Sequence, residues 1–251
     1  MQELFKDRAF WIVGASYGIG RSLAFELSAH GAKLVLSGRD RDALVDLNEE
    51  LASKHRVVAF DVSEPDSVRS AYQAIETFGI ELDSLIYLAG VYEPTKIGAI
   101  SRQNIRSTLT VNFEGAVNCV QAVLPKFIEQ NRGQLVLCGS LSAYRGLPRG
   151  QPYSGAKAAL VSFAESLKAE VQSQGIDVRL LSPGFVKTRL TAKNNFEMPG
   201  ILSTAEAAKE IVLGLQSNKY EIRFPRMFSR KLKMLKIIPD ALYFKLVKRI
   251  K

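Results

Sequence analysis

The sequence predicts a doubly wound α/β fold, in which helices cover both faces of a parallel β-sheet. Short apolar runs alternate along the chain with longer stretches that have the 3.6-residue period of a helix, and the apolar runs have no polar face. Strands of this kind, separated by helices, are joined by right-handed crossovers. No linker rich in Pro, Gly or Ser, no internal repeat and no low-complexity block divides the 251 residues, so we expect a single domain.

Strands and helices are expected to follow each other in a regular order. Three strand and helix pairs open the chain: 9–15 (AFWIVGA) with 21–31, 33–38 (KLVLSG) with 41–53, and 57–62 (VVAFDV) with 65–79. Later strands are expected at 85–90, 134–140, 177–184 and 220–224. Residues 189–204 lose the periodic pattern, which is where a substrate lid is expected. A helix follows that Ser203 or Thr204 caps, with Glu206 as the partner in a capping box.

The composition is that of an ordinary globular protein, with 47% hydrophobic and 24% charged residues. No apolar run approaches the ~18 residues that a membrane-spanning helix needs, and the first residues have no secretory leader, so a cytoplasmic protein is expected. The cysteines, Cys119 and Cys138, and the histidines, His30 and His55, lack the spacing of a disulfide framework or a metal site. We therefore expect no bound metal.

The net charge of +9 is concentrated at the C-terminus. Residues 219–251 hold 11 of the 34 basic residues but only 2 of the 25 acidic ones, so the rest of the chain is charge-balanced. A nucleic-acid-binding protein would carry its basic residues over the fold or in a recognition motif, and neither is present. We therefore expect no nucleic-acid partner for the main domain.

A glycine-rich turn, residues 14–20 (GASYGIG), stands between the first strand and the first helix. Its glycines, Gly14, Gly18 and Gly20, allow a backbone to approach a pyrophosphate closely, and the start of the helix stabilises the negative charge. A turn of this kind can also simply pack a helix against a strand. The position between a strand and a helix favours nucleotide binding.

The end of the second strand bears on the choice between NAD and NADP. An NAD site places an acidic residue there, on the adenosine ribose, but this chain has Gly38 followed by Arg39. The planar guanidinium of Arg39 suits a phosphate, so NADP(H) is the preferred cofactor. Asp40 lies close enough to keep NAD(H) as the alternative, and surface pairing of Arg39 with its acidic neighbours is the structural alternative.

A third group of residues points to acid/base chemistry. Tyr153 and Lys157 are one helical turn apart, so they share a helix face, and a neighbouring ammonium favours the phenolate form of a tyrosine. Ser140, after a separate strand, can hydrogen-bond the oxygen of a reacting carbonyl. Alone, a Tyr and Lys pair at this spacing is usually an exposed helix face. Together with the glycine-rich turn it indicates catalysis.

The chain resembles the short-chain dehydrogenase/reductase superfamily, in its short oxidoreductase branch, over roughly residues 8–224. The residues that match in order and spacing are Gly14, Gly18, Gly20, Asn112, Ser140, Tyr153, Lys157, Pro183, Gly184 and Thr188. The resemblance implies a Rossmann-like sheet of about seven strands in a catalytic domain over 1–224, with a basic helical extension over 225–251. It also implies hydride transfer between a nicotinamide cofactor and a carbonyl or alcohol.

The resemblance assigns a role to each catalytic position. Tyr153 is expected to be the acid/base, and Lys157 to lower the pKa of Tyr153 and hold the nicotinamide ribose. Ser140 is expected to orient the carbonyl, and Asn112 to hold a water that relays protons. The cofactor is expected to contact Gly14, Ser16, Tyr17, Gly18, Ile19, Gly20, Arg39, Asp61, Val62, Ala89, Gly90, Tyr153, Lys157, Pro183, Gly184, Val186 and Thr188.

The sequence departs from the family pattern at two places. Val13 stands where a Thr often precedes the first glycine, which removes one hydroxyl contact. The NNAG motif that follows the fourth strand reads Tyr87-Leu88-Ala89-Gly90 here. Because both Asn side chains are missing, the sheet contacts that they make need another explanation.

The basic extension is expected to form two amphipathic helices that divide at Pro239. Phe228, Leu232, Leu235 and Ile238 make the apolar face of the first, and Leu242, Tyr243, Leu246, Val247 and Ile250 that of the second. Such helices suit a peripheral contact with the inner membrane surface. The alternatives are packing against the substrate pocket or a partner subunit, and contact with a nucleic acid, for which the sequence has no recognition motif.

Two functions follow from these residues. The first is an NADP(H)-dependent carbonyl reductase or alcohol dehydrogenase for a hydrophobic or lipid-like ketone or secondary alcohol. The second is a nicotinamide-binding sensor or scaffold at a membrane surface, with weak or no turnover. The resemblance also implies a homodimer, with a tetramer as the alternative.

Overall fold

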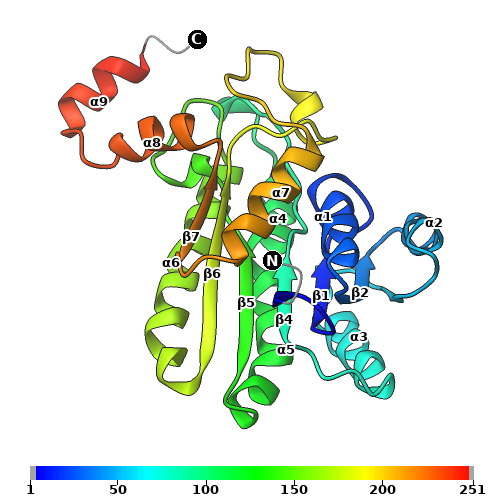
Figure 1. Ribbon diagram of the computed structural model, residues 1–251. Helices are drawn as coiled ribbons and strands as arrows, with labels where there is room; N and C mark the ends of the chain where they lie inside the picture. The colour runs from blue at the N-terminus through cyan, green and yellow to red at the C-terminus, as the bar shows by residue number, and fades with distance from the viewer. Residues whose placement is uncertain (1–3, 249–251) are drawn as a thin grey trace.

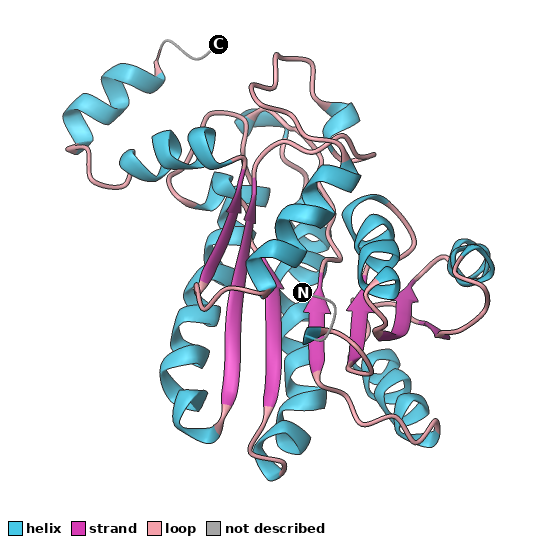
Figure 2. Ribbon diagram, in the orientation of Figure 1, coloured by secondary structure: helices cyan, strands magenta, loops and turns pink. Residues whose placement is uncertain are grey.

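A computed structural model describes residues 4–248 of the chain. Seven parallel strands form one sheet in the order β3-β2-β1-β4-β5-β6-β7 (Figures 1 and 2). The strands are β1 (Ala9–Val13), β2 (Lys33–Gly38), β3 (Arg56–Ala59), β4 (Ser84–Tyr87), β5 (Gly133–Cys138), β6 (Ile176–Pro183) and β7 (Glu221–Phe224). The chain order reverses at β1, between β2 and β4. The predicted doubly wound, Rossmann-like fold is therefore confirmed.

Helices cover both faces of this sheet, as the apolar strands require. The helices α1 (Gly18–Ala29), α2 (Arg41–Glu50) and α7 (Thr204–Leu215) pack on one face. The helices α3 (Pro65–Thr77), α5 (Gly115–Glu129) and α6 (Tyr153–Val171) pack on the other, and α4 (Arg102–Leu109) lies beside α6. Figure 1 shows α1 and α7 side by side in front of the sheet.

Strand β1 shows how the sequence produces these two layers. All five of its residues are buried. Successive side chains of a strand point to opposite faces, so Trp11 packs among the residues of α3 and α5, while Phe10 and Ile12 pack against α1. The indole nitrogen of Trp11 donates to Ser37 Oγ at 2.9 Å, which satisfies this buried polar group within the sheet.

The loops at the carboxyl ends of the strands carry most of the irregular structure. Short helical turns stand here at η2 (Ile97–Ala99), η4 (Leu141–Ala143) and η6 (Thr191–Lys193). In a doubly wound sheet the crevice at this edge, where the strand order reverses, is the usual ligand site. The following helix α7 begins with the predicted capping box, in which Ser203 is the cap and the Glu206 carboxylate accepts a hydrogen bond from the backbone nitrogen of Ser203.

The C-terminal segment forms two helices, α8 (Arg226–Met234) and α9 (Asp240–Val247). Pro239 is the N-cap residue of α9, which agrees with the predicted division. Ile250 lies outside the described residues. Within 4–248, no helix combines the length and the apolar character needed to cross a membrane. Figure 1 shows α9 standing away from the sheet, near the end of the molecule where the strands finish.

Two side chains hold this helix pair against the loop that precedes α6. The guanidinium of Arg145 donates to the carbonyl oxygen of Leu235 at 2.7 Å and to that of Ile238 at 2.5 Å, and it pairs with Asp240. The ring of Tyr243 is buried under Arg145, with 3.9 Å between the guanidinium carbon and the ring centroid, and its hydroxyl donates to the carbonyl of Gly146. The elbow between α8 and α9 is thus fixed by side chains.

Candidate active site

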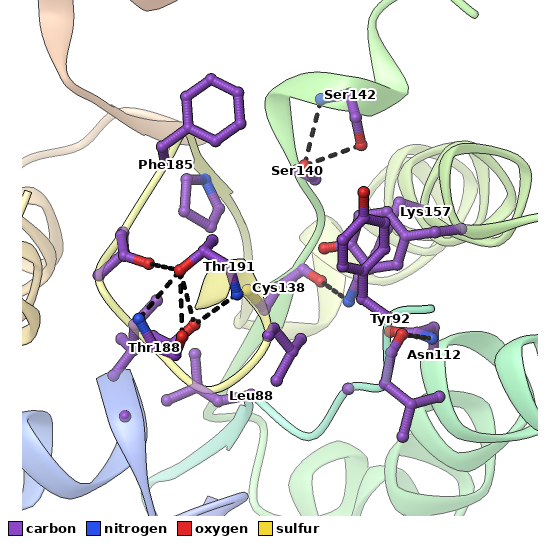
Figure 3. A pocket seen from close by; sticks show the side chains of 18 of the residues that line it. Leu88, Tyr92, Asn112, Cys138, Ser140, Ser142, Lys157, Phe185, Thr188 and Thr191 are labelled. Atoms are coloured by element: carbon purple, nitrogen blue, oxygen red, sulfur yellow. Dashed lines mark hydrogen bonds between the residues drawn. The ribbon is translucent and has the colours of Figure 1, made fainter. Parts of the chain in front are cut away.

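A cavity of about 1150 Å³ lies at the carboxyl edge of the sheet. The glycine-rich turn, the ends of β4, β5 and β6, the start of α6 and the inner face of α8 all line it. The four side chains predicted to be catalytic lie along this cavity, as do all the predicted cofactor contacts except Asp61. Figure 3 shows Asn112, Ser140 and Lys157 around the same space, with Thr188 across from them.

The turn 14–20 has a shape that only glycine permits at its first position. Gly14 has φ +97°, and a Cβ there would lie 2.6 Å from the backbone nitrogen of Ala89. No side chain caps the start of α1, where Tyr17 is the N-cap residue, so the first N–H groups of this helix are left for a ligand. A close backbone approach beside an uncapped helix start fits a dinucleotide pyrophosphate.

The end of β2, where an NAD site has an acidic residue, lies close to the glycine-rich turn. A Cβ at Gly38 would lie 2.5 Å from Ser16 Oγ, so a larger residue displaces that side chain. The side chain of Arg39 is 66% exposed, and its only ion pair among the described residues is a long one of 3.9 Å with Asp61. Arg39 is therefore available to a ligand.

The carboxylate of Asp40 is already engaged. It accepts a hydrogen bond from the Tyr17 hydroxyl, and it caps α2 by accepting from the nitrogen of Ala43 at 3.1 Å. Both hydrogen bonds hold the pKa of Asp40 below its ordinary value, and the one from Tyr17 has the larger effect. On the other side of Tyr17, the guanidinium carbon of Arg189 lies 3.4 Å from the ring centroid. Asp40 thus organises the turn, a role that the sequence did not indicate beside ribose binding and surface pairing with the neighbouring arginines.

Asp61 does not line the cavity, unlike the other predicted cofactor residues. Its carboxylate turns back on its own loop and accepts from the nitrogen of Ser63 at 2.9 Å and from the Ser63 hydroxyl at 2.7 Å. This local turn is a property of short acidic side chains. Val62, the next residue, does line the cavity.

The Tyr153 and Lys157 pair opens helix α6. The buried ammonium of Lys157 donates to the carbonyl oxygen of Cys138 at 2.7 Å (Figure 3). It lies 5.8 Å from the centroid of the Tyr153 ring. Burial lowers the pKa of Lys157. Burial raises the pKa of Tyr153, while the hydrogen bond with the Ser140 hydroxyl lowers it.

The lowering of the Tyr153 pKa by Lys157 stays a prediction. Desolvation of the phenol acts against it and raises the pKa of Tyr153. The ammonium is directed to a backbone carbonyl of β5, and it is itself desolvated. Tyr153 therefore stays protonated at neutral pH in this form of the protein.

Ser140 is held by its neighbour in the turn that follows β5. Its Oγ accepts from the backbone nitrogen of Ser142 at 3.1 Å and from the Ser142 hydroxyl at 2.9 Å (Figure 3). With two donors directed at it, the Ser140 oxygen keeps its own proton free to donate elsewhere. The role of Ser142 had no signal in the sequence.

Asn112 lies in a π-helical segment, η3 (Thr110–Glu114), between α4 and α5. Its side-chain nitrogen donates to the carbonyl of Val91 at 2.8 Å and to that of Thr108 at 2.9 Å. Its oxygen Oδ1 is buried and, among the described residues, has no partner. A Cβ at Gly90 would lie 2.9 Å from this oxygen and 3.8 Å from Lys157 Nζ, so both atoms face the same space. A buried acceptor of this kind needs a ligand or a water.

The altered motif at residues 87–90 has a structural explanation. The buried phenol of Tyr87 donates to the carbonyl of Val111 at 2.5 Å, so it ties β4 to the segment that carries Asn112. Its neighbour Leu88 packs against the apolar cluster of α1 and lines the cavity. Tyr87 therefore connects β4 to this segment without the asparagines of the family motif.

Sequence reasoning missed other residues of the cavity. The ring of Tyr92 meets that of Tyr153 edge to face at 5.1 Å, and its hydroxyl donates to Asn194 at 3.0 Å. Only the fold could reveal this contact, because no spacing links residues 92 and 153. The apolar face of α8 also lines the cavity, through Phe228, Leu232 and Leu235. The sequence showed the spacing of these apolar residues, but not where in the molecule they pack.

Comparison with known proteins agrees with this geometry. A family model described as short chain dehydrogenase matches residues 8–199, which leaves α7, α8 and α9 outside the match. A protein of Myxococcus xanthus (strain DK1622), named an uncharacterized oxidoreductase, is 32% identical over 247 residues, covering 97% of this chain and 98% of the relative.

Solved structures share the fold. A short chain dehydrogenase/reductase from Burkholderia phymatum in complex with NAD superposes with a TM-score of 0.83 at 24% identity, covering 91% of this chain and 92% of the other. An alcohol dehydrogenase from the archaeon Thermococcus sibiricus complexed with 5-hydroxy-NADP gives a TM-score of 0.79 at 22% identity, covering 87% and 96%. At these identities the likeness concerns the fold alone.

Proposed function

This chain belongs to the short-chain dehydrogenase family of NAD(P)-dependent dehydrogenases and reductases, and we propose that it is an NADP(H)-dependent carbonyl reductase for a hydrophobic, lipid-like ketone. The reverse reaction oxidises the corresponding secondary alcohol. One observation carries the proposal. Asn112, Ser140, Tyr153 and Lys157 meet in a single cavity whose remaining lining is largely apolar.

The glycine-rich turn and the groups around it would hold the cofactor. The turn 14–20 would take the pyrophosphate, Arg39 the adenosine-ribose phosphate, and Lys157 the nicotinamide ribose. When bound, the reduced nicotinamide supplies a hydride to the carbonyl carbon. The site must then provide the proton that the carbonyl oxygen gains.

Tyr153 is the proposed proton donor. A tyrosine hydroxyl is protonated at neutral pH, as an acid in the direction of reduction must be, and the ammonium of Lys157 beside the Tyr153 ring would favour loss of that proton. As negative charge develops on the carbonyl oxygen, Tyr153 transfers its proton to that oxygen, while the Ser140 hydroxyl donates a hydrogen bond to it.

The reprotonation of Tyr153 is assigned to Lys157 and Asn112. The unpaired Oδ1 of Asn112 faces the same space as Lys157 Nζ, beside Gly90. This supports a water held between them, through which a proton reaches Lys157 and then Tyr153. The lowered pKa of Lys157 favours release of its proton.

The apolar part of the cavity supports a hydrophobic substrate. It is lined by Leu141, Leu147, Phe185, Phe196, Phe228, Leu232 and Leu235. Two aromatic contacts order this region, since the ring of Phe185 lies 5.8 Å from that of Phe196 and 5.7 Å from that of Phe228. A site of this kind binds apolar groups and fixes their orientation with few polar contacts.

Replacing Tyr153 with Phe tests the enzymatic proposal. With NADPH and a panel of hydrophobic ketones, kcat/KM is expected to fall about 10³-fold, because general acid catalysis contributes 10²–10⁴. The dissociation constant for NADPH should not change. A wild-type protein that binds NADPH but reduces none of the ketones would instead favour the sensor or scaffold function.

Replacing Arg39 with Ala tests the cofactor preference. The dissociation constant for NADP is expected to rise about tenfold or more, and that for NAD to change little, because a phosphate contact of this kind is worth 1.5–3 kcal/mol. Arg41→Ala is the matched control, since Arg41 begins α2 and does not line the cavity. Equal losses for the two cofactors would contradict the preference.

A further inference from the structure

The helix pair α8–α9 presents two different faces. The inner face is used within the molecule, since Phe228, Leu232 and Leu235 line the catalytic cavity and Tyr243 is 2% exposed. The remaining surface of the pair, which we call the outer surface, carries apolar side chains that are largely open to solvent, and on α9 Leu242 and Phe244 flank the buried Tyr243 on either side. Their exposed fractions are 73% for Met227, 62% for Met234, 80% for Ile237, 50% for Leu242, 59% for Phe244 and 41% for Leu246. Exposed apolar groups gathered on two short helices indicate an interaction surface.

Basic residues stand among these apolar groups. On α8, Met227, Arg230, Lys231 and Met234 follow i, i+3, i+4, i+7 spacing, so they share one face. Further along the pair, Lys236, Lys245 and Lys248 are exposed. Within residues 4–248, no carboxylate lies within ion-pair distance of Arg230, Lys231, Lys236, Lys245 or Lys248. The outer surface is therefore both apolar and positively charged.

We propose that this outer surface docks on an anionic lipid membrane. Helices that lie in a membrane interface bury apolar side chains at the boundary of the acyl chains and place their cations among the headgroups. The outer surface has this combination. Its exposed Met, Ile, Leu and Phe side chains stand beside Lys and Arg side chains that have no ion-pair partner within residues 4–248. Each cation near such a surface strengthens the binding constant for the membrane about fivefold.

Other occupants fit this surface less well. A second copy of the chain would place the same basic surface against itself in a twofold interface, and like charges oppose that contact. A nucleic acid would pair with the cations but would leave the exposed Ile237 and Leu242 side chains without apolar partners. A lipid surface satisfies both kinds of side chain.

The docking surface and the catalytic cavity share helix α8. Its outer face would lie on the bilayer while Phe228, Leu232 and Leu235 on its inner face line the cavity. A ketone dissolved in the bilayer would thus reach the cavity beside α8. This last step rests on the proposed reductase function, whereas docking itself does not.

Flotation with vesicles tests the docking. The full-length chain is expected to float with phosphatidylcholine vesicles that contain phosphatidylglycerol, and to remain at the bottom with phosphatidylcholine alone. High salt should weaken the binding, because exposed charges are screened. Equal flotation with both kinds of vesicle, or with neither, would overturn the proposal.

Two matched substitutions locate the surface. Leu242→Glu on α9 should abolish flotation, whereas Leu213→Glu on α7 should leave it unchanged, although Leu213 is 51% exposed and Leu242 50%. The variant Lys231→Gln with Lys245→Gln, which keeps the apolar groups, should bind roughly 30-fold more weakly. Equal behaviour of the two Leu variants would contradict the assignment, as would unchanged binding of the double variant.

An activity measurement separates this proposal from the reductase function. Leu242→Glu should leave kcat/KM for a water-soluble ketone unchanged and lower it for a ketone carried in anionic vesicles. If the protein floats but reduces no ketone, the docking proposal stands and the reductase proposal fails. If neither the wild type nor the variant floats, and both reduce the two ketones equally well, the reductase proposal stands and the docking proposal fails.

Discussion

The glycine-rich turn at residues 14–20 and helix α8 of the pair α8–α9 line the same cavity, but different forces hold the turn and the helix pair. The turn is fixed by backbone, because the nitrogen of Ala89 leaves no room for a Cβ at Gly14. The helix pair is fixed by two side chains, Arg145 and Tyr243. A backbone constraint admits almost no substitution, whereas side-chain contacts can be exchanged one at a time. This difference allows a constant cofactor site and a variable substrate site in one cavity.

Electric charge follows the same division. The chain up to residue 218 is charge-balanced, while residues 219–251 hold 11 basic and 2 acidic residues. The half-buried carboxylate of Glu221 links helix α8 to the rest of the fold. It accepts from Lys233 of α8 at 2.7 Å, from Tyr144 at 2.5 Å and from Ser182 at 2.8 Å. Glu221 thus adds an attachment of the basic segment to those made by Arg145 and Tyr243.

Replacing Gly14 with Ala should have the largest effect, because it breaks the backbone constraint. The side chain would be strained at φ +97° and would collide with the nitrogen of Ala89, which costs about 3 kcal/mol. Thermal unfolding should show this loss, and dye displacement should show that NADPH binding is lost. Gly146→Ala is the control, since nothing lies within 4 Å of a Cβ there. If the two variants lose equal stability, the close approach of backbone at Gly14 is not what fixes the turn.

Replacing Tyr243 with Ala should have a local effect of similar size. Removing this buried ring costs about 3 kcal/mol, but the loss should be confined to α9, which has no extensive contact with any strand among the described residues. Hydrogen exchange is expected to increase in α9 and in the elbow 235–239, with little change in the unfolding of the sheet. Tyr243→Phe keeps the ring and loses one hydrogen bond, worth about 1 kcal/mol. A loss of global stability as large as that of Gly14→Ala would contradict the comparison.

Acidification should act on the main sheet and on the helix pair in different pH ranges, with the smallest effects. Burial, and then the charge of Lys54, lowers the pKa of His55, which packs beside α1 and β2. The folded state therefore prefers neutral His55, and this stability is present above pH 6.5 and lost as the pH falls below it. His55→Asn, which does not titrate, should remove this dependence of the unfolding temperature.

The helix pair should respond at lower pH, through Glu221. Burial of Glu221 raises its pKa, but the hydrogen bonds from Lys233, Tyr144 and Ser182 outweigh burial and hold the pKa below 4.5. This contribution is present above pH 4.5 and is lost as the pH falls through the lowered pKa. Hydrogen exchange in α8 should therefore increase only in that range. A rise already between pH 7 and 5.5 would show that another group anchors α8.

Much of the fold and part of the site were determined by local sequence. The apolar runs and helical periods gave the strands and helices of the doubly wound sheet, because burial on one or both faces imposes these periods. The spacing of Tyr153 and Lys157 and the context of Gly14 likewise depend on neighbours within one helix or one turn. Such features need no knowledge of distant residues.

Only the tertiary structure decided the remaining properties. Burial sets the pKa of Tyr153 against the direction that Lys157 alone would give, and burial depends on segments far apart in the chain. The unpaired oxygen of Asn112, the inward turn of Asp61 and the position of α8 along the cavity arise in the same way. The sequence alone determined that the C-terminal segment is basic and amphipathic. Which face lines the cavity and which stays exposed was decided by the contacts of the helix pair with Arg145 and Gly146, which lie 90 or more residues earlier in the chain.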